Sequence, residues 1–142
     1  TIDENNTMKI LILCNGDYGD PGWYKSRFSQ YSKIVCVDGA AKMTHKIGMV
    51  PDLVVGDMDS ISADDRQRLT QSGSEFIVYP PEKDLTDTQI AYELAQEEGA
   101  SSVTVWGGIG SRLDHTLSTI YNAFWLVACG IDVCFVSPVV TV

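Results

Sequence analysis

The sequence is poor in basic residues. Its 142 residues include ten Lys plus Arg against nineteen Asp plus Glu, so the formal net charge is −9. Proteins that coat nucleic acid or an anionic membrane need a cationic face, and we therefore expect neither kind of partner. An excess of acidic residues favours a cationic partner, of which a divalent metal ion is the simplest. What matters next is whether these acidic residues are spread out or gathered.

Long apolar runs are also missing. No stretch approaches the roughly 18 consecutive apolar residues that a membrane-spanning helix needs. The first residues lack the basic start of a signal peptide. No two cysteines form a C-x-x-C pair, which argues against a zinc or redox motif. We therefore expect a cytoplasmic protein with buried, reduced thiols at Cys14, Cys36, Cys129 and Cys134.

The composition that remains is typical of one globular domain. Hydrophobic residues make up 44% of the chain and charged residues 20%. We expect residues 1–7 to be a disordered end and residues 8–137 to fold. Six short runs rich in β-branched and aromatic residues predict strands at residues 8–14, 33–37, 52–55, 75–79, 102–106 and 132–136. Most runs are continuous rather than alternating, which is typical of strands buried on both faces of a parallel sheet.

Amphipathic segments between these runs predict helices at residues 40–47, 62–72, 86–98 and 114–129. Ser62 and Thr86 stand at N-cap positions, and Thr86 and Gln89 have the spacing of a capping box. In the last helix, five residues at helical spacing predict a core-facing stripe: Leu117, Ile120, Tyr121, Phe124 and Ala128. Strands that alternate with helices predict an α/β fold, with a mostly parallel sheet of about six strands and helices on both faces.

Polar or glycine-rich segments follow five of the predicted strands. They are Asn15–Asp17, Asp38–Gly39, Gly56–Ser60, Glu82–Asp87 and Gly107–His115. Open α/β sheets bind their ligands outside the carboxyl ends of the strands. We therefore expect these five segments to meet at one edge of the sheet, where they would form a binding site.

Asp57 and Asp59 come directly after the third predicted strand. If the chain stays extended there, both carboxylates point the same way and repel each other unless a cation lies between them. Such hard oxygen ligands suit Mg²⁺. The alternative is a turn stabilised by Asx hydrogen bonds, with a helix cap at Ser60 or Ser62.

Two further segments carry charged groups suited to a phosphate or a metal ion. Lys83, Asp84 and Asp87 precede or open a helix, although Asp87 could simply complement the helix dipole. The glycines at 107, 108 and 110 let the backbone approach a ligand, and Arg112 supplies a forked donor for phosphate oxygens. This segment matches neither the dinucleotide-binding nor the P-loop pattern.

The aromatic and histidine residues are less informative. Trp23, Trp106 and Trp125 are expected in the core, although Trp106 borders the glycine-rich turn and could contact a base. His45 is expected on a solvated helix face. His115 follows Asp114 in the glycine-rich turn, and the sequence favours neither contact with a ligand nor a purely structural role for it.

Together these motifs resemble the thiamine pyrophosphokinase family. The resemblance rests on GDMDS at 56–60, EKDLTDTQIA at 82–91 and GGIGSRLDHTLSTI at 107–120. VDGAA at 37–41 and PDLVVGD at 51–57 support it. The likeness covers residues 8–136, and the three main motifs in this order are very specific.

The resemblance implies an enzyme that moves the pyrophosphoryl group of ATP to the hydroxyl of thiamine, giving thiamine diphosphate and AMP. It also implies dependence on Mg²⁺ and a homodimer. Metal binding would fall on Asp57, Asp59, Asp84 and Asp87, and catalysis on Asp57, Arg112 and Asp114, with Asp114 or Asp57 orienting the hydroxyl or taking its proton. The residues expected at the ATP are Asn15, Gly16, Asp38, Gly39, Ser60, Lys83, Thr86, Gly108, Arg112 and His115.

The family also has a β-rich domain after the α/β domain, which supplies much of the thiamine pocket. This sequence stops at Val142, and residues 138–142 are expected to begin the connection to that domain. Two alternative functions remain open at this point. One is another Mg²⁺-dependent phosphotransferase or phosphohydrolase, and the other is a nucleotide-binding module without catalysis.

Overall fold

A computed structural model describes residues 8–79, 86–109 and 113–138. Its single sheet has the strand order β4-β3-β2-β1-β5-β6, and every neighbouring pair is parallel. The strands are β1 (Lys9–Leu13), β2 (Lys33–Val37), β3 (Leu53–Gly56), β4 (Glu75–Val78), β5 (Ser102–Trp106) and β6 (Asp132–Val136). The predicted parallel six-stranded sheet is confirmed, with strand ends that differ by at most one residue.

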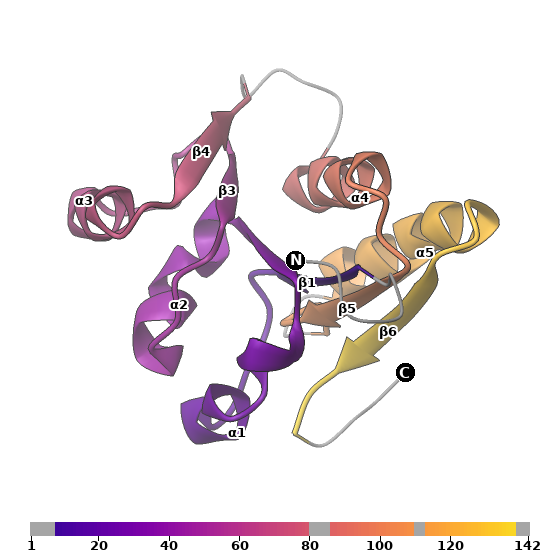
Figure 1. Ribbon diagram of the computed structural model, residues 1–142, viewed down its shortest axis with the longest axis horizontal. Helices are drawn as coiled ribbons and strands as arrows, with labels where there is room; N and C mark the ends of the chain where they lie inside the picture. Colours follow the sequence, from indigo (N-terminus) through magenta and orange to yellow (C-terminus); the bar gives the residue numbers. More distant parts are fainter. Residues whose placement is uncertain (1–7, 80–85, 110–112, 139–142) are drawn as a thin grey trace.

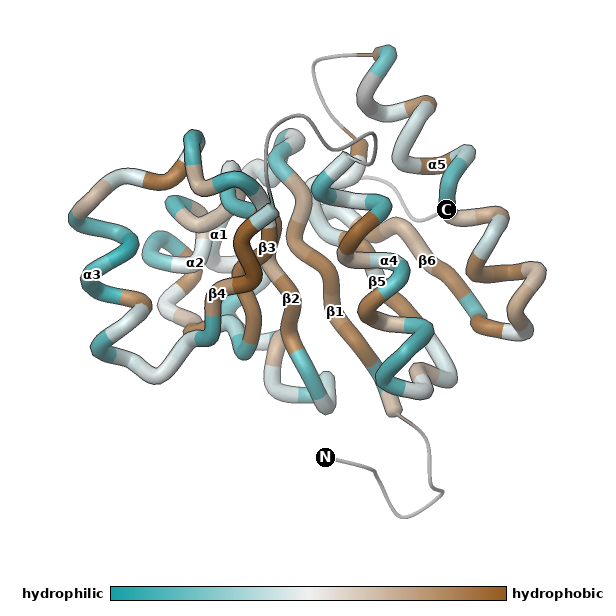
Figure 2. The backbone as a smooth tube through the Cα atoms, turned by 90° about the horizontal axis from the view of Figure 1, so that it is seen from above, coloured by the Kyte–Doolittle hydropathy of each residue, from teal (hydrophilic) through white to brown (hydrophobic). Residues whose placement is uncertain are grey.

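Helices cover both faces of this sheet (Figure 1). One face carries α1 (Pro21–Lys25), α2 (Ala41–Ile47) and α3 (Ala63–Gln71), and the other carries α4 (Asp87–Glu97) and α5 (Leu113–Ala128). Two short 3₁₀ turns, Phe28–Gln30 and Asp38–Ala40, precede β2 and α2. The strands form the hydrophobic centre of the molecule (Figure 2). Side chains of β1 such as Ile10 and Leu13 are fully buried, because helices pack on each side of the central strands.

The helix ends follow the local sequence signals. The Ser62 hydroxyl accepts a hydrogen bond from the N–H of Asp65 and so caps α3. Thr86 and Gln89 form the predicted capping box at the start of α4. One helix was not predicted: α1 is short, with Pro21 at its first position and Asp20 as its N-cap. This proline-after-aspartate start was a usable signal.

The predicted core stripe of α5 is wrong. Of its five residues only Ile120 packs against the core, and Leu117, Tyr121 and Phe124 are 57%, 73% and 64% exposed. Thr119, Ala123 and Leu126 are the buried residues of this helix. Apolar residues occur on two sides of α5, and helical spacing alone does not say which side meets β6 and α4. Trp125 is also exposed rather than in the core.

The other aromatic and sulfur side chains behave largely as expected. Trp106 is buried and packs against Tyr24 with ring centroids 4.8 Å apart, so it belongs to the core and does not face a base. All four cysteines are free thiols. Burial raises the pKa of the Cys14 thiol to about 12, which keeps it protonated and unreactive. Cys129 is exposed, contrary to the prediction, because it lies at the solvent-facing end of α5.

None of the helices in the described residues is long and apolar enough to cross a membrane.

Candidate functional site

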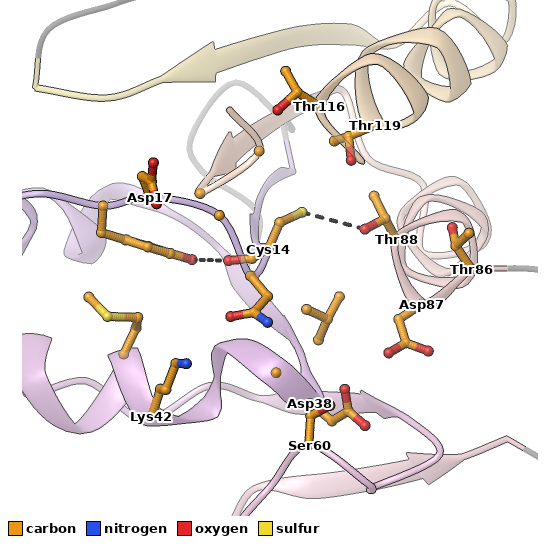
Figure 3. A pocket seen from close by; sticks show the side chains of 18 of the residues that line it. Cys14, Asp17, Asp38, Lys42, Ser60, Thr86, Asp87, Thr88, Thr116 and Thr119 are labelled. Atoms are coloured by element: carbon orange, nitrogen blue, oxygen red, sulfur yellow. Dashed lines mark hydrogen bonds between the residues drawn. The ribbon is translucent and has the colours of Figure 1, made fainter. Parts of the chain in front are cut away.

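The connections between strands place a cavity at the carboxyl ends of β1, β2 and β5. From β1 the chain moves outward through β2 and β3 to β4, and then returns across the sheet to add β5 and β6 on the other side of β1. The segment after β1 leads to α1 on one face of the sheet and the segment after β5 leads to α5 on the other face, and such a switch point is where open parallel sheets hold ligands. The cavity there has a volume of about 1110 Å³ and is shown in Figure 3.

The loops after β1 and β5 touch at their backbones. A Cβ on Gly16 would collide with the carbonyl oxygen of Gly107. The two loops can therefore lie this close together only because residue 16 has no side chain. The N–H of Cys14 donates to the carbonyl of Trp106 at 2.8 Å, and the Tyr18 hydroxyl donates to the carbonyl of Cys14 at 2.7 Å. These contacts hold the floor of the cavity rigid.

Two carboxyl groups face each other on one side of the cavity (Figure 3). Asp38 follows β2 and is only 3% exposed, and its Oδ2 accepts a hydrogen bond from the N–H of Met58 at 2.9 Å. Asp87 is the first residue of α4 and shares a hydrogen bond with the Asp38 carboxyl. Burial, then the hydrogen bond and charge of Asp38, and then the charge of Asp57 raise the pKa of Asp87 to about 7.

Gly56 lies directly beneath this acidic pair. Its φ of 146° is unfavourable for residues with a side chain. A Cβ at this position would stand 2.7 Å from Asp38 Cγ and 3.0 Å from Asp87 Oδ2. The absence of a side chain at residue 56 is therefore what lets the two carboxyl groups meet at the end of β3.

The chain does not stay extended through Asp57 and Asp59, contrary to the condition on which the paired-carboxylate prediction rested. Met58 between them has a φ of 72°, and the N–H of Asp59 donates to Asp57 Oδ1 at 2.9 Å. This is the Asx turn that the alternative predicted. The charge of Asp57 contributes to the raised pKa of Asp87, whereas Asp59 is exposed to solvent.

The cavity brings together most of the residues predicted from the sequence to bind ATP. Its lining includes Asn15, Gly16, Asp38, Gly39, Ser60, Thr86 and Gly108. Asp87, which was predicted as a metal ligand, also lines it. Asp57, Asp59 and Asp114 do not line it, and Asp114 is exposed in the first turn of α5. Lys83, Asp84 and Arg112 lie outside the described residues, as does the side chain of His115. His45 is exposed on α2, as predicted.

Several cavity residues lie outside the five segments predicted to form the site. Among them are Tyr18, Lys42, Lys46, Thr88, Thr116 and Thr119, of which the last two lie in α5. Thr88 follows Asp87 on α4, and its hydroxyl lies 3.7 Å from Cys14 Sγ (Figure 3). Lys42 directly follows the VDGAA motif, and this proximity was the available signal. Thr116 and Thr119 of α5 lie within the glycine-rich motif at 107–120, which was the signal available for them.

The donor set on the acidic side fits a hard divalent cation. Within the described residues no three His, Cys, Asp or Glu side chains form a ready metal cage. Mg²⁺, however, takes few carboxylates and retains waters or phosphate oxygens. The pair of Asp38 and Asp87, with the charge of Asp57 near it, matches that requirement. Without a cation, burial and the neighbouring carboxyl groups raise the pKa of Asp87 to about 7, so this side chain can hold a proton near neutral pH.

Comparison with known proteins agrees with this architecture. The family model described as "Thiamin pyrophosphokinase, catalytic domain" matches residues 24–135. A thiamine pyrophosphokinase of Bacillus subtilis (strain 168) is 36% identical over 73 residues, which are 51% of this chain and 34% of that protein.

Solved structures match over a longer range. The crystal structure of thiamin pyrophosphokinase from Geobacillus thermodenitrificans is 28% identical with a TM-score of 0.69, and the match covers 91% of this chain and 59% of that chain. The Bacillus subtilis enzyme structure has 24% identity and a TM-score of 0.75, with 92% and 61% covered, and shows the shared fold. The chain thus spans about three fifths of these solved proteins. Because the family model matches well over half of its residues, this chain belongs to the thiamin pyrophosphokinase catalytic domain family.

Proposed function

We propose that this chain supplies the ATP- and metal-binding part of a thiamine pyrophosphokinase. The reaction transfers the pyrophosphoryl group of ATP to the hydroxyl of thiamine and yields thiamine diphosphate and AMP. The observation that carries the proposal is the cavity at the β1–β5 switch point, which is lined both by the carboxyl pair of Asp38 and Asp87 and by Gly107 and Gly108 after β5. The match to the catalytic domain model of the thiamin pyrophosphokinase family supports the choice of this reaction.

We assign the metal of this site as Mg²⁺. Asp87 and Asp57 would hold it, with Asp59 and Asp84 as further proposed ligands and Asp38 beside Asp87. When bound, Mg²⁺ would neutralise charge on the phosphate oxygens of ATP. Asp38 holds the turn at Met58 through its hydrogen bond and so positions the segment that carries Asp57. This positioning is the contribution that the protein makes before any substrate arrives.

The chemistry requires the thiamine hydroxyl to attack the β-phosphorus in line with the departing AMP. An aspartate near the hydroxyl would orient it or accept its proton, and we propose Asp114 or Asp57 for this role. Arg112 would bind phosphate oxygens. Phosphoryl transfer with a loose transition state depends on alignment and charge more than on a strong base. The backbone at Gly107 and Gly108, both buried at the cavity, would exclude water from the reacting phosphate.

We further propose that residues 8–137 form the catalytic domain and that a β-rich domain reached through residues 138–142 completes the thiamine pocket. The span of about three fifths of the solved relatives supports this division. A homodimer in the cytoplasm is the proposed form of the complete enzyme. Analytical ultracentrifugation of a chain that includes the further domain tests the dimer, and a monomer at micromolar concentration would contradict it.

The reaction itself is tested by measuring AMP release from ATP and Mg²⁺, with and without thiamine. AMP that forms only with thiamine supports the kinase. Phosphate release that ignores thiamine would instead indicate a phosphohydrolase, and nucleotide binding with no turnover would indicate a binding module.

The metal assignment is tested by substituting the carboxylates one at a time. Asp87→Asn should raise the Mg²⁺ concentration needed for half-maximal ATP binding at least about tenfold, because a charged ligand is lost. Asp59→Asn tests the proposed ligand that the structure leaves exposed. Asp64→Asn on α3 removes an exposed charge away from the cavity and serves as the control. Unchanged Mg²⁺ dependence in both Asp87→Asn and Asp59→Asn would overturn the assignment.

A further inference from the structure

Two lysines of α2 line the cavity on the side away from the carboxyl pair. Lys42 and Lys46 stand one helical turn apart, and both contribute to the cavity wall. Figure 3 shows Lys42 rising from α2 toward the cavity, with Asp38 and Asp87 across from it. Among the described residues that line the cavity, these two are the basic ones. The cavity therefore has a positive side and a negative side.

The positive side stands out in a chain that has few basic residues. Only ten Lys and Arg are present against nineteen acidic residues, and two of the ten face this one cavity. In the part of the chain that the structure describes, the ion pairs join Lys33 to Glu98 and Arg68 to Asp65. Neither lysine of α2 takes part in an ion pair with a described carboxylate. Among the described residues, their positive charges are therefore not neutralised by an ion pair within the fold.

Helix stability explains only one of the two charges. Lys46 lies in the last turn of α2, where the helix dipole favours a cation. Lys42 lies in the first turn, where the dipole gives a cation no such benefit. Both residues are exposed to solvent and also line the cavity. The location of Lys42 is best explained by something that enters the cavity.

We propose that Lys42 and Lys46 bind the phosphate groups of a polyphosphate ligand on the side of the cavity opposite Asp38 and Asp87. This inference rests on the proposed function in taking the ligand to be ATP. Free carboxylates repel a polyphosphate, whereas an ammonium group attracts it and donates up to three hydrogen bonds. A ligand that spans the cavity would thus place some phosphate oxygens near the acidic side with its cation and others against the lysines. The two sides would fix the direction in which the polyphosphate lies.

The test measures binding of three probes in the presence of Mg²⁺: ATP, inorganic triphosphate and adenosine. Lys42→Gln should weaken the binding of ATP and of triphosphate about tenfold, and Lys42→Gln with Lys46→Gln by up to about a hundredfold. Adenosine binding should stay unchanged, because it carries no phosphate. Lys25→Gln removes an exposed lysine in the last turn of α1 that does not line the cavity, and should leave all three affinities unchanged. Thermal unfolding of each variant confirms that it is folded.

The outcomes separate this inference from the proposed function. If the double variant binds ATP and triphosphate as tightly as the unaltered chain, the lysine assignment is overturned, and thiamine-dependent AMP formation can still support the kinase. If triphosphate binding depends on the lysines but thiamine never promotes AMP formation, the lysine assignment stands and the proposed reaction fails. Binding of neither ATP nor triphosphate by the unaltered chain would overturn both.

Discussion

Replacing Asp87 by Asn should stabilise the metal-free protein while damaging its proposed function. Asp87 is a partly buried carboxyl group whose neighbours are the carboxyl groups of Asp38 and Asp57. Ionisation of Asp87 in the folded chain is therefore opposed by burial and by like charges. The amide of Asn has a similar shape, carries no charge and can donate the hydrogen bond to Asp38 that the protonated acid donates. Folding of the Asp87→Asn variant would therefore no longer place a second negative charge beside Asp38.

The magnitude follows from the pKa of Asp87. Folding raises this pKa from 3.8 to about 7, which corresponds to at most about 4 kcal/mol at roughly 1.36 kcal/mol per pKa unit. Solvent screening of a half-buried group reduces this value, and the lost interaction with the N-terminus of α4 costs about 0.3–1 kcal/mol. We expect a net stabilisation of about 1–2 kcal/mol at pH 8, or a rise of about 3–8 °C in melting temperature.

The pH dependence has a definite sign. Between pH 3.8 and about 7 the folded chain holds a proton on Asp87 that the unfolded chain has released. The contribution of Asp87 to stability therefore falls as pH rises through this window and is constant above it. The advantage of Asp87→Asn should be small at pH 4, grow up to about pH 7 and then level off.

Thermal or urea unfolding in EDTA at several pH values measures this difference. Asp64→Asn is the matched control, because Asp64 lies in the first turn of α3 and is exposed. Its removal should destabilise the protein slightly at neutral pH. A melting temperature for Asp87→Asn at pH 8 that equals or falls below that of the unaltered chain would refute the reasoning. So would a stabilisation that does not change between pH 5 and pH 8.

Two other substitutions test the packing. Gly56→Ala should destabilise the fold by about 2–4 kcal/mol, because the new Cβ meets Asp38 at a backbone φ that disfavours side chains; Gly73→Ala shares a positive φ but has open space, and should cost only about 1 kcal/mol. Equal unfolding midpoints for these two variants would contradict the close contact. Leu126→Ala should cost about 2–5 kcal/mol and Leu117→Ala less than about 0.5 kcal/mol, since only Leu126 is buried. The reverse order in urea unfolding would mean that α5 packs with its other side.

Local patterns predicted most of the fold. The six strands were found because each is a short run rich in β-branched and aromatic residues, and α3 and α4 because Ser62 and Thr86 cap them. The buried side of α5 could not be found in this way. Its exposed apolar residues, such as Tyr121 and Phe124, satisfy the same helical spacing as a core stripe. Burial depends on which neighbours a helix meets, and periodicity carries no information about them.

The sequence predicted the location of the candidate site but not its detailed geometry. Polar segments after β1, β2 and β5 converge because carboxyl ends of parallel strands share one edge. The prediction that Asp57 and Asp59 share an extended segment failed at Met58, where the backbone turns into the left-handed region. Non-glycine residues with positive φ are rare, and no local sequence pattern predicts that Met58 adopts this conformation.

By itself, the sequence determined most of the helices and strands of this protein, the edge of the sheet where its polar residues gather and the family to which it belongs. These properties depend on neighbours in the chain, on caps and on the order of motifs. Only the tertiary structure decided that the carboxyl groups of Asp38 and Asp87 meet and that Lys42 and Lys46 line the same cavity. The physical reason is that Asp87 on α4 is far along the chain from Asp38, which follows β2, and from the lysines of α2. The order of strands in the sheet is what brings α4 beside β2.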